Sequence, residues 1–347
     1  MKSTRTILCI LGAAFMLSSG CSRTASTQSV QPLKVNGTQL CYADGTPAVM
    51  RGVSLGWHNL WPRFYNESAV ATLKNDWNVP IIRAAIGADD HANADNPGCH
   101  EGFMTEPDFA LEKLFAAVDG AIAAGCYVIV DWHSHTLHPE AAADFFRQVA
   151  TRYKGIPNVI YELFNEPVCQ SFEDNRSYDD LGNPDAMQAY WAKLKAYAEG
   201  LIKIITDIDD RQPLILMGCP SWDQRIDLPA ADPVDYANIM YTVHFYAATH
   251  KQSLRDACDA AIAAGTPVFI SECGGCDASG NGDIDCNEWE AWYGWAAANG
   301  VSILTWSISD KDETCSMLTP GAASEGPWDE SVIKPWGNIV KNWITEK

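Results

Sequence analysis

The sequence predicts a single (β/α)8 barrel, in which eight parallel strands form a closed ring inside a layer of helices. Three observations carry this prediction. Short, continuously apolar runs recur along the chain, amphipathic helical segments separate them, and a glycine follows four of those helices. Runs that are apolar throughout are typical of strands buried on both faces, as in a parallel sheet. No G-x-G-x-x-G motif or P-loop follows a strand, which disfavours the main alternative, an open doubly wound sheet.

The eight predicted strands are the apolar or β-branched runs of the chain. They span residues 49–55, 80–86, 126–132, 158–164, 213–218, 238–245, 266–271 and 301–307. Strand–helix units repeated over about 300 residues are typical of this barrel.

Four helices are marked by both their periodicity and their ends. They are predicted over residues 108–124, 140–154, 253–264 and 288–299, and are followed by Gly125, Gly155, Gly265 and Gly300. Glycine readily adopts the left-handed conformation that ends many helices, so its position supports each boundary.

Three long segments rich in Gly, Asp and Asn follow predicted strands two, four and eight. They span residues 87–107, 168–185 and 310–328. All three follow the carboxyl end of a strand, where the active sites of such barrels form.

Composition narrows the class of protein. The 347 residues are 47% hydrophobic, and 44 acidic against 24 basic side chains give a net charge of −20. These values exclude disordered, collagen-like and multi-span membrane proteins. Nucleic-acid binding would require a basic face, which this acidic chain lacks. Thirteen Trp and twelve Tyr residues are consistent with either a rich core or aromatic faces that stack on sugars.

The N-terminus resembles an export signal. Lys2 and Arg5 precede an apolar stretch at 7–17, and small residues lead to Cys21. We interpret residues 1–20 as a signal peptide of the lipoprotein type, Cys21 as its lipidated residue, 21–32 as a flexible tether and 33–347 as the catalytic domain. The alternative is ordinary cleavage nearby. The protein is expected to be exported, either lipid-anchored in a bacterial envelope or secreted.

Cysteine usage agrees with export. Of the twelve cysteines, Cys9 and Cys21 belong to the signal region, which leaves an even set of ten. In an oxidising compartment we expect several disulfides among them and little free thiol. Pairing is plausible among the four cysteines of the last two loops, or between one of these and Cys99. These four are Cys273, Cys276, Cys286 and Cys315. A redox or zinc role for the C-x-x-C at 273–276 is disfavoured.

Polar and ionisable residues gather at the ends of the predicted strands. They are Arg83, Asp131, His133, His135, Asn165, Glu166, His244, Tyr246, Glu272 and Trp306. Such residues are costly at the ends of apolar strands unless they are paired or used. A barrel would bring them together in one cleft.

Glu166 and Glu272 end predicted strands four and seven. Glycoside hydrolysis needs a carboxyl pair of this kind, because one group protonates the leaving oxygen and the other attacks or stabilises the anomeric carbon. We expect Arg83 to help Glu272 stay ionised. The negative charge of that neighbour should raise the pKa of Glu166.

The sequence resembles glycoside hydrolase family 5, and within it the bacterial endoglucanases (endo-β-1,4-glucanases, cellulases). The resemblance runs from about residue 33 to the C-terminus. Its motifs are Arg83-Ala84-Ala85, the run from Val159 to Pro167, His244-Phe245-Tyr246, Ser271-Glu272, and the segment from Trp306 to Glu313.

The resemblance implies a role for each matching residue. Glu166 would be the acid/base and Glu272 the nucleophile of a retaining, double-displacement reaction that needs no metal or cofactor. Substrate-binding residues would be Arg83, His133, Asn165, Trp222, His244, Tyr246, Trp306 and Lys311. The substrate would be a β-1,4-glucan such as cellulose, and we expect a monomer.

This sequence departs from the family pattern at three places. Cys273 follows the nucleophile where the family commonly has Trp, and a disulfide could involve it. Gly87 replaces an aromatic residue after strand two. His58 and Trp61 do not superpose cleanly on the subgroup pattern, so no role in distal subsites is assigned to them.

Three alternatives remain open. A metal-dependent hydrolase could use the H-x-H formed by His133 and His135. A non-catalytic glycan-binding protein is disfavoured because both carboxylates are intact. Within the family, a β-mannanase or a broad β-1,4-glycanase is the main alternative.

Overall fold

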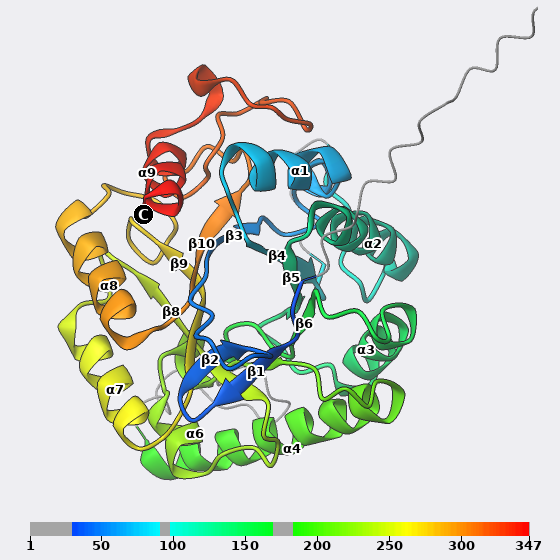
Figure 1. The fold of residues 1–347 in the computed structure, drawn as a ribbon, viewed down its shortest axis with the longest axis vertical. Helices are drawn as coiled ribbons and strands as arrows, with labels where there is room; N and C mark the ends of the chain where they lie inside the picture. The colour runs from blue at the N-terminus through cyan, green and yellow to red at the C-terminus, as the bar shows by residue number, and fades with distance from the viewer. Residues whose placement is uncertain (1–29, 91–97, 169–182, 347) are drawn as a thin grey trace, which may run out of the picture.

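The computed structural model describes residues 30–90, 98–168 and 183–346, and within them eight parallel strands close into a barrel (Figure 1). The strand order around the ring is β10-β3-β4-β5-β6-β7-β8-β9. This confirms the predicted (β/α)8 fold. The signal peptide, Cys9, Cys21 and most of the tether lie outside the described residues.

Each barrel strand falls on one of the predicted apolar runs, with ends that differ by a few residues. The strands are β3 (Arg51–Leu55), β4 (Ile81–Gly87), β5 (Tyr127–His133), β6 (Val159–Glu162), β7 (Ile215–Met217), β8 (Ile239–Tyr246), β9 (Val268–Gly274) and β10 (Ile303–Ile308). All strand pairs in the barrel are parallel.

Helices surround the ring on its outer side (Figure 1). They are α1 (Glu67–Asp76), α2 (Pro107–Ala124), α3 (Pro139–Arg152), α4 (Pro184–Ile208), α7 (Gln252–Ala263), α8 (Cys286–Asn299) and α9 (Pro335–Thr345). Shorter pieces are α5 (Pro220–Asp223), α6 (Asp227–Ala231) and the 3-10 turns Pro62–Phe64 and Glu330–Val332. Gly125 and Gly300 end α2 and α8 in the left-handed conformation, with φ values of 70° and 65°, as the sequence predicted.

A β-hairpin covers the end of the barrel at which the strands begin, and the sequence analysis did not predict it. It consists of β1 (Leu33–Asn36) and β2 (Gln39–Tyr42). Leu33 and Leu40 pack against side chains inside the barrel, including Ile129, Met240 and Leu304. Figure 1 shows the hairpin lying across the ring. It therefore seals the end of the barrel opposite the predicted cleft.

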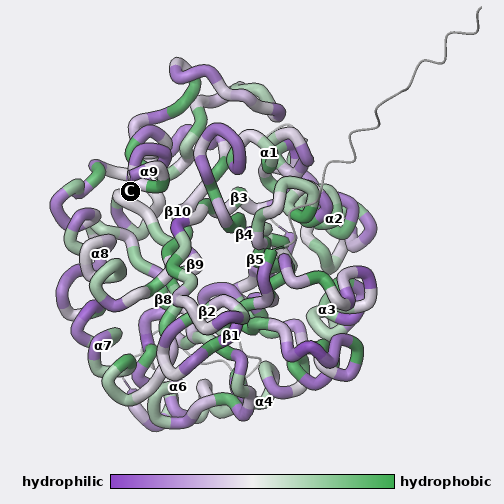
Figure 2. The backbone as a smooth tube through the Cα atoms, viewed as in Figure 1, coloured by the Kyte–Doolittle hydropathy of each residue, from purple (hydrophilic) through white to green (hydrophobic). Residues whose placement is uncertain are grey.

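Most of the apolar surface is buried between the strands and the helices. Figure 2 shows apolar segments concentrated along the strands and hydrophilic ones along the outer helices. Five tryptophans are fully buried, namely Trp77, Trp132, Trp191, Trp292 and Trp336. The abundance of indole side chains therefore largely reflects the core, with only part of it available to a ligand.

Cysteine pairing agrees with the prediction in one bridge, between two of the four cysteines of the last two loops, but not in the number of bridges. In the described part of the chain, one disulfide joins Cys276 to Cys315, linking the loops after β9 and β10. Five other cysteines are buried as thiols: Cys41, Cys126, Cys219, Cys258 and Cys273. The expectation of several disulfides is thus wrong for these residues, including Cys273. Their thiols serve as small core side chains, and those of Cys126, Cys219 and Cys273 face backbone carbonyl groups at 3.3–3.4 Å.

No helix among the described residues is long and apolar enough to cross a membrane.

Asn238 links the hairpin to the barrel through hydrogen bonds, so its substitution tests how much the hairpin contributes to stability. Its Oδ1 accepts a hydrogen bond from Val35 N at 2.8 Å, and its Nδ2 donates to the carbonyl groups of Leu33 and Gln212 at 3.2 and 2.8 Å. N238A leaves these buried groups unpaired and should lower the free energy of unfolding by about 2 kcal/mol. Urea unfolding measures this change. N342A, at an exposed position in α9, is the control, and equal stability of the two variants would contradict the assignment.

Candidate active site

The side chain of Arg83, on β4, is the centre of a buried polar network at the carboxyl ends of the strands. Its Nε donates to Glu162 Oε2 at 2.7 Å, and its Nη1 donates to Glu272 Oε2 at 2.8 Å. Its Nη2 donates to Asn165 Oδ1 at 2.7 Å and lies 3.0 Å from Asp131 Oδ2. The guanidinium group on β4 therefore connects side chains from β5, from β6 and its end, and from β9.

Charge balance in this network is uneven, because three carboxyl groups share one guanidinium. Burial acts to lower the pKa of Arg83, but the charges of Asp131, Glu162 and Glu272 raise it well above its ordinary value. Burial raises the pKa of Asp131, and the attraction of Arg83 opposes that rise. Arg83 therefore stays charged, and its removal would leave buried carboxylates without a cation.

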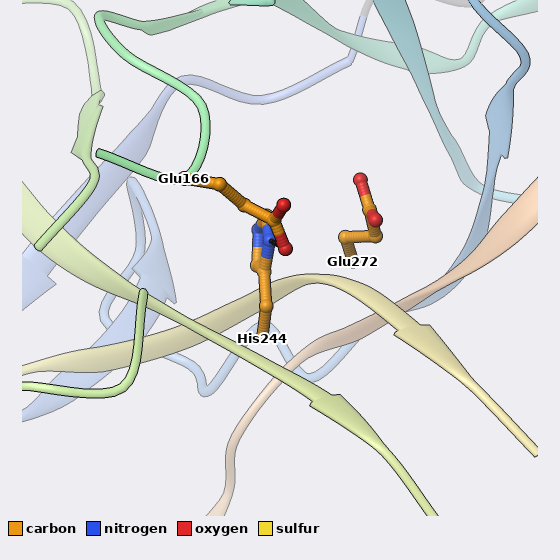
Figure 3. A group of neighbouring side chains, drawn as sticks. All are labelled: Glu166, His244 and Glu272. Atoms are coloured by element: carbon orange, nitrogen blue, oxygen red, sulfur yellow. Dashed lines mark hydrogen bonds and ion pairs between the residues drawn. The ribbon is translucent and has the colours of Figure 1, made fainter. Parts of the chain in front are cut away.

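The two predicted catalytic carboxyl groups lie close together. An oxygen of Glu166, an oxygen of Glu272 and a ring nitrogen of His244 lie within 4.8 Å of one another. Figure 3 shows the two carboxyl groups side by side, with that of Glu166 against the ring of His244. Glu166 Oε1 is 3.0 Å from His244 Nδ1, and Tyr246 OH donates to Glu272 Oε1 at 2.8 Å.

The surroundings of these carboxyl groups differ from each other, as expected, but their pKa values move in the same direction. Burial raises the pKa of Glu166, and nearby His135 and Arg83 oppose the rise. Burial also raises the pKa of Glu272 against the influence of His244, Arg83 and the Tyr246 hydroxyl. The predicted rise for Glu166 is present, but its cause is burial, whereas the sequence analysis assigned it to the negative neighbour.

A one-residue irregularity in strand register turns Glu272 toward the cleft. Thr242 of β8 pairs with Phe269 of β9, whereas His244 pairs with Glu272, so three residues of β9 span two of β8. Phe269 packs inside the barrel, and strict alternation would point only Ser271 in the same direction. The extra residue lets both Ser271 and Glu272 reach the centre.

His244 is held from both sides of its ring. Its Nδ1 faces Glu166, and its Nε2 lies 2.9 Å from Ser271 Oγ. The Ser271 hydroxyl in turn donates to Glu162 Oε1 at 2.7 Å. Burial lowers the pKa of His244 to about 4, so the ring is neutral near pH 7.

Asn165 has one amide atom committed to the network and one without a partner. Its Oδ1 accepts from Arg83, while its buried Nδ2 has no hydrogen-bond partner among the described residues. A buried donor of this kind is costly when unpaired, so a ligand hydroxyl would stabilise it.

Aromatic rings surround His133 beside the carboxyl pair. His133 Nδ1 lies 2.6 Å from Asp131 Oδ2, and its ring is stacked with Trp306 at 5.5 Å between centroids. Trp57 contacts the His133 ring edge-on, with 4.3 Å between the centroids. A Cβ atom on Gly87 would lie 3.1 Å from the Trp57 ring. It would also lie 2.6 Å from Asn59 Oδ1, so Asn59 and Trp57 fill the position that a side chain at Gly87 would take.

A cavity of about 430 Å³ opens beside the carboxyl pair. It is lined by Glu166, Trp222, Gln224, His244, Tyr246, His250 and Ala278. Trp222 lies on the wall of this cavity. Lys311 does not line this cavity. Its side chain is half exposed and forms an ion pair with Glu313 at 2.5 Å.

His133 and His135 do not form a joint metal-binding pair in this arrangement. Their ring centroids are 6.4 Å apart. His133 faces Asp131, and His135 Nδ1 lies 3.2 Å from the carbonyl oxygen of Glu166. Each histidine has a separate partner, which disfavours the H-x-H interpretation.

His58 and Trp61, left without a role by the sequence, are both buried. His58 Nδ1 accepts a hydrogen bond from Gly87 N at 2.9 Å, and Trp61 belongs to the main core. Burial lowers the pKa of His58 to about 3. Both residues support the loop after β3.

Several residues of the network were not predicted to be functional. Glu162, Ser271, Asp223 and Trp57 all contact predicted site residues. Glu162 is an acidic residue inside an apolar strand, a signal that could have identified it. Asp223 directly follows Trp222 in the sequence, but only the fold brings it to Glu166.

The chain is similar to known proteins over most of its length. A family model described as cellulase (glycosyl hydrolase family 5) matches residues 41–312. Endoglucanase Z of Dickeya dadantii is 35% identical over 333 residues, which cover 93% of this chain and 71% of that protein. An endoglucanase of Clostridium saccharobutylicum is 34% identical over 329 residues, which cover 93% of this chain and 67% of that protein.

Solved structures show the same similarity. A structure from Cytophaga hutchinsonii has a TM-score of 0.79 and 36% identity, and the match covers 90% of this chain and 94% of that one. The catalytic domain of a Thermobifida fusca endoglucanase, solved with cellotetraose, has a TM-score of 0.77 and 29% identity. That match covers 90% of this chain and 97% of that one.

The buried neutral His58 makes stability depend on pH. Its pKa is about 3 in the folded protein and near 6.5 when unfolded, so only the unfolded chain binds this proton between those values. The free energy of unfolding should therefore fall as the pH decreases. H58N keeps a hydrogen-bond acceptor but removes the titration, so the stability difference between wild type and variant should change by about 3 kcal/mol between pH 7 and pH 4. Urea unfolding at a series of pH values tests this, and parallel curves would refute it.

Proposed function

The chain belongs to glycosyl hydrolase family 5, the cellulase family, and on that basis we propose that it is an endo-β-1,4-glucanase that retains the configuration of the anomeric carbon. The reaction would use the two paired carboxyl groups, with Glu166 as acid/base and Glu272 as nucleophile. The endoglucanases that it resembles support the substrate class, as does the relative solved with cellotetraose.

The observation that carries the proposal is the separation of the two carboxyl groups. Oxygens of Glu166 and Glu272 lie within 4.8 Å of each other. Retaining glycosidases have carboxyl groups about 5–5.5 Å apart, whereas inverting enzymes need about 6.5–9.5 Å to place a water between base and sugar. Oxygens this close leave no room for the water of an inverting enzyme, which favours direct attack by a carboxylate.

In the first step, Glu272 attacks the anomeric carbon while the bond to the leaving oxygen breaks. Glu166 gives its proton to that oxygen, so the departing chain leaves as a neutral alcohol. Burial, which raises the pKa of Glu166, favours a proton on this carboxyl group before the step. The product is a glycosyl ester of Glu272 and an ionised Glu166.

In the second step, the ionised Glu166 removes a proton from water, and the resulting hydroxide oxygen attacks the same carbon. The ester bond breaks and returns Glu272 to its carboxylate form. Two inversions at one carbon retain the original configuration. His244, held neutral by burial, faces Glu166 Oε1 through its Nδ1 at 3.0 Å.

Arg83 and Tyr246 hold the nucleophile in position for this reaction. They contact different oxygens of Glu272, which fixes the plane of its carboxyl group. The Nδ2 of Asn165, which has no partner in the part of the chain that the structure describes, would bind the 2-hydroxyl of the sugar, as the family resemblance implies. Trp306 would lie under the cleaved sugar, and Trp222 would contact the chain in the adjoining cavity.

We also propose that the enzyme acts outside the cytoplasm. The support is the signal-like N-terminus, with Cys21 as the proposed site of a lipid anchor and 21–32 as a tether. An enzyme placed there would meet polysaccharides that cannot enter the cell.

Substrate preference is tested by parallel assays on carboxymethylcellulose, lichenan, glucomannan and mannan. We expect turnover of the first three, with mannan the poorest, because the relatives are endoglucanases. Faster turnover of mannan than of carboxymethylcellulose would favour the β-mannanase alternative. Binding without release of reducing ends would favour a glycan-binding protein.

The nucleophile is tested by E272A. This variant should lose at least about 10⁴-fold in kcat, and added azide should restore part of the turnover by forming a glycosyl azide of inverted configuration. For wild type, proton NMR should show the β-anomer as the first product from a β-1,4-glucan. An initial α-anomer would contradict the assignment of Glu272.

The acid/base is tested by E166A on two classes of substrate. Loss of the proton donor should lower kcat/KM for cello-oligosaccharides by about 10²–10⁴-fold, because their leaving group is a poor one. An activated aryl cellobioside needs little protonation, so its kcat/KM should fall much less. Equal losses on both substrates would argue against Glu166 as the acid.

A further inference from the structure

Asp223 is a fully buried acidic residue that the catalytic mechanism above does not use. It ends α5, after β7. Its Oδ1 accepts a hydrogen bond from Cys219 N at 2.6 Å. Its Oδ2 accepts one from Glu166 N at 3.2 Å and lies 3.3 Å from His244 Nε2. One carboxyl group therefore contacts both the backbone of Glu166 and the histidine beside the Glu166 side chain.

The environment of Asp223 is unfavourable for a carboxyl group with only a structural role. Among the described residues, His244 is the only basic side chain within ion-pair distance of it. Burial and the charges of Glu166 and Glu162 raise its pKa well above the ordinary value. Placing such a group beside other carboxyl groups costs free energy, and costs of this kind concentrate at functional sites.

The backbone that Asp223 holds is itself strained. Glu166 has a φ of 46°, a left-handed conformation that residues with a side chain rarely adopt. Conformations of this kind persist only where surrounding contacts fix them. The hydrogen bond from Glu166 N to Asp223 is such a contact, and it determines where the Glu166 side chain begins.

The turn that carries Asp223 also forms the wall of the cleft. Ser221, Trp222 and Asp223 have φ values of 62°, 54° and 59°, so three consecutive residues are left-handed. Trp222 and Glu166 line the same cavity. The Asp223 carboxyl group, bonded to Cys219 N at the start of this turn and to Glu166 N after the neighbouring strand β6, connects the cavity wall to the acid/base.

We propose that Asp223 is a positioning residue for Glu166, and that its carboxyl group holds the Glu166 backbone and the His244 ring in the arrangement required for proton transfer to the leaving oxygen. This inference rests on the proposed function, because it assigns Asp223 a part in the acid step of that reaction.

The hydrogen-bond network explains how His244 takes part. The Ser271 hydroxyl donates to Glu162, so toward His244 Nε2 it can only accept. Asp223 Oδ2, on the same side of the ring, is a further acceptor. Both favour the proton of the neutral ring on Nε2, which leaves Nδ1 to accept a hydrogen bond from a protonated Glu166. Asp223 thus supports the acid form of Glu166 through the backbone and through the ring.

The test compares two substrates that differ in their need for an acid. The variants are D223A, which removes both acceptor oxygens, and D223N, which keeps the side-chain volume but only one oxygen. The substrates are cellotetraose, with a poor leaving group, and dinitrophenyl cellobioside, with a good one. The quantity is kcat/KM, which reports the steps up to the glycosyl-enzyme.

We expect D223A to lower kcat/KM for cellotetraose by about 10²-fold, since a small displacement of a catalytic group has an effect of that size. For dinitrophenyl cellobioside the loss should be less than about 5-fold, because its departure needs little protonation. D223N should also lose more kcat/KM on cellotetraose than on dinitrophenyl cellobioside, with smaller losses on both. This variant keeps the test possible if D223A does not fold.

D209N is the matched control. Asp209 is also fully buried and also accepts a backbone hydrogen bond, from Gly155 N at 3.3 Å, but its partner is Arg211 and it does not line the cleft. This variant should lower stability and leave the ratio of kcat/KM values between the two substrates unchanged. Thermal unfolding of all variants separates loss of fold from loss of the acid step.

Two results would overturn the inference. Equal losses on both substrates in D223A and D223N would show that Asp223 matters for the fold only, and wild-type rates on both would show that it matters for neither. Failure of the proposed function would appear differently, as wild-type enzyme inactive on both substrates, and it would remove the basis of the inference as well.

Discussion

The structure at the cleft depends on one buried guanidinium group. Arg83 contacts Asp131, Glu162, Asn165 and Glu272, which come from different strands or strand ends. A planar group with five donors in fixed directions can hold several acceptors at set angles, which the flexible, single ammonium group of lysine cannot. The network therefore fixes the relative positions of strands β4, β5, β6 and β9 at the end where the chemistry occurs. It also explains how three buried carboxyl groups coexist in the interior of a barrel.

Two backbone irregularities, together with the Arg83 network, position the two carboxyl groups of the site. The shifted register between β8 and β9 brings Ser271 and Glu272 to the same side of the strand, where regular alternation would allow only one of them. The left-handed conformation at Glu166 turns the end of β6 toward His244. Each irregularity disturbs regular hydrogen bonding, and each places one carboxyl group of the pair. The regular barrel provides the frame, while its departures from regularity provide the site.

The two ends of the barrel have opposite physical character. At the end where the strands begin, the β1–β2 hairpin and aliphatic side chains such as Ile129 and Met240 fill the interior. At the other end, the interior consists of charged and aromatic side chains around Arg83 and His133. An apolar, sealed base contributes stability by burial, and this allows the polar end to keep costly buried charges.

The sequence by itself determined the barrel and most of the residues at the cleft. Continuous apolar runs and helix-ending glycines are local features, so all eight strands and helices such as α2 and α8 were predictable within a few residues. Residues at strand ends, such as His133, were identifiable because parallel strands of a barrel end at one face. Only the tertiary structure decided the rest. The contact of Asp223 with Glu166, the inward turn of Glu272 and the closure of the barrel by the hairpin depend on register, turn conformation and packing between distant segments. No local pattern in the chain encodes these relations, because each arises only when residues far apart in sequence meet in the folded barrel.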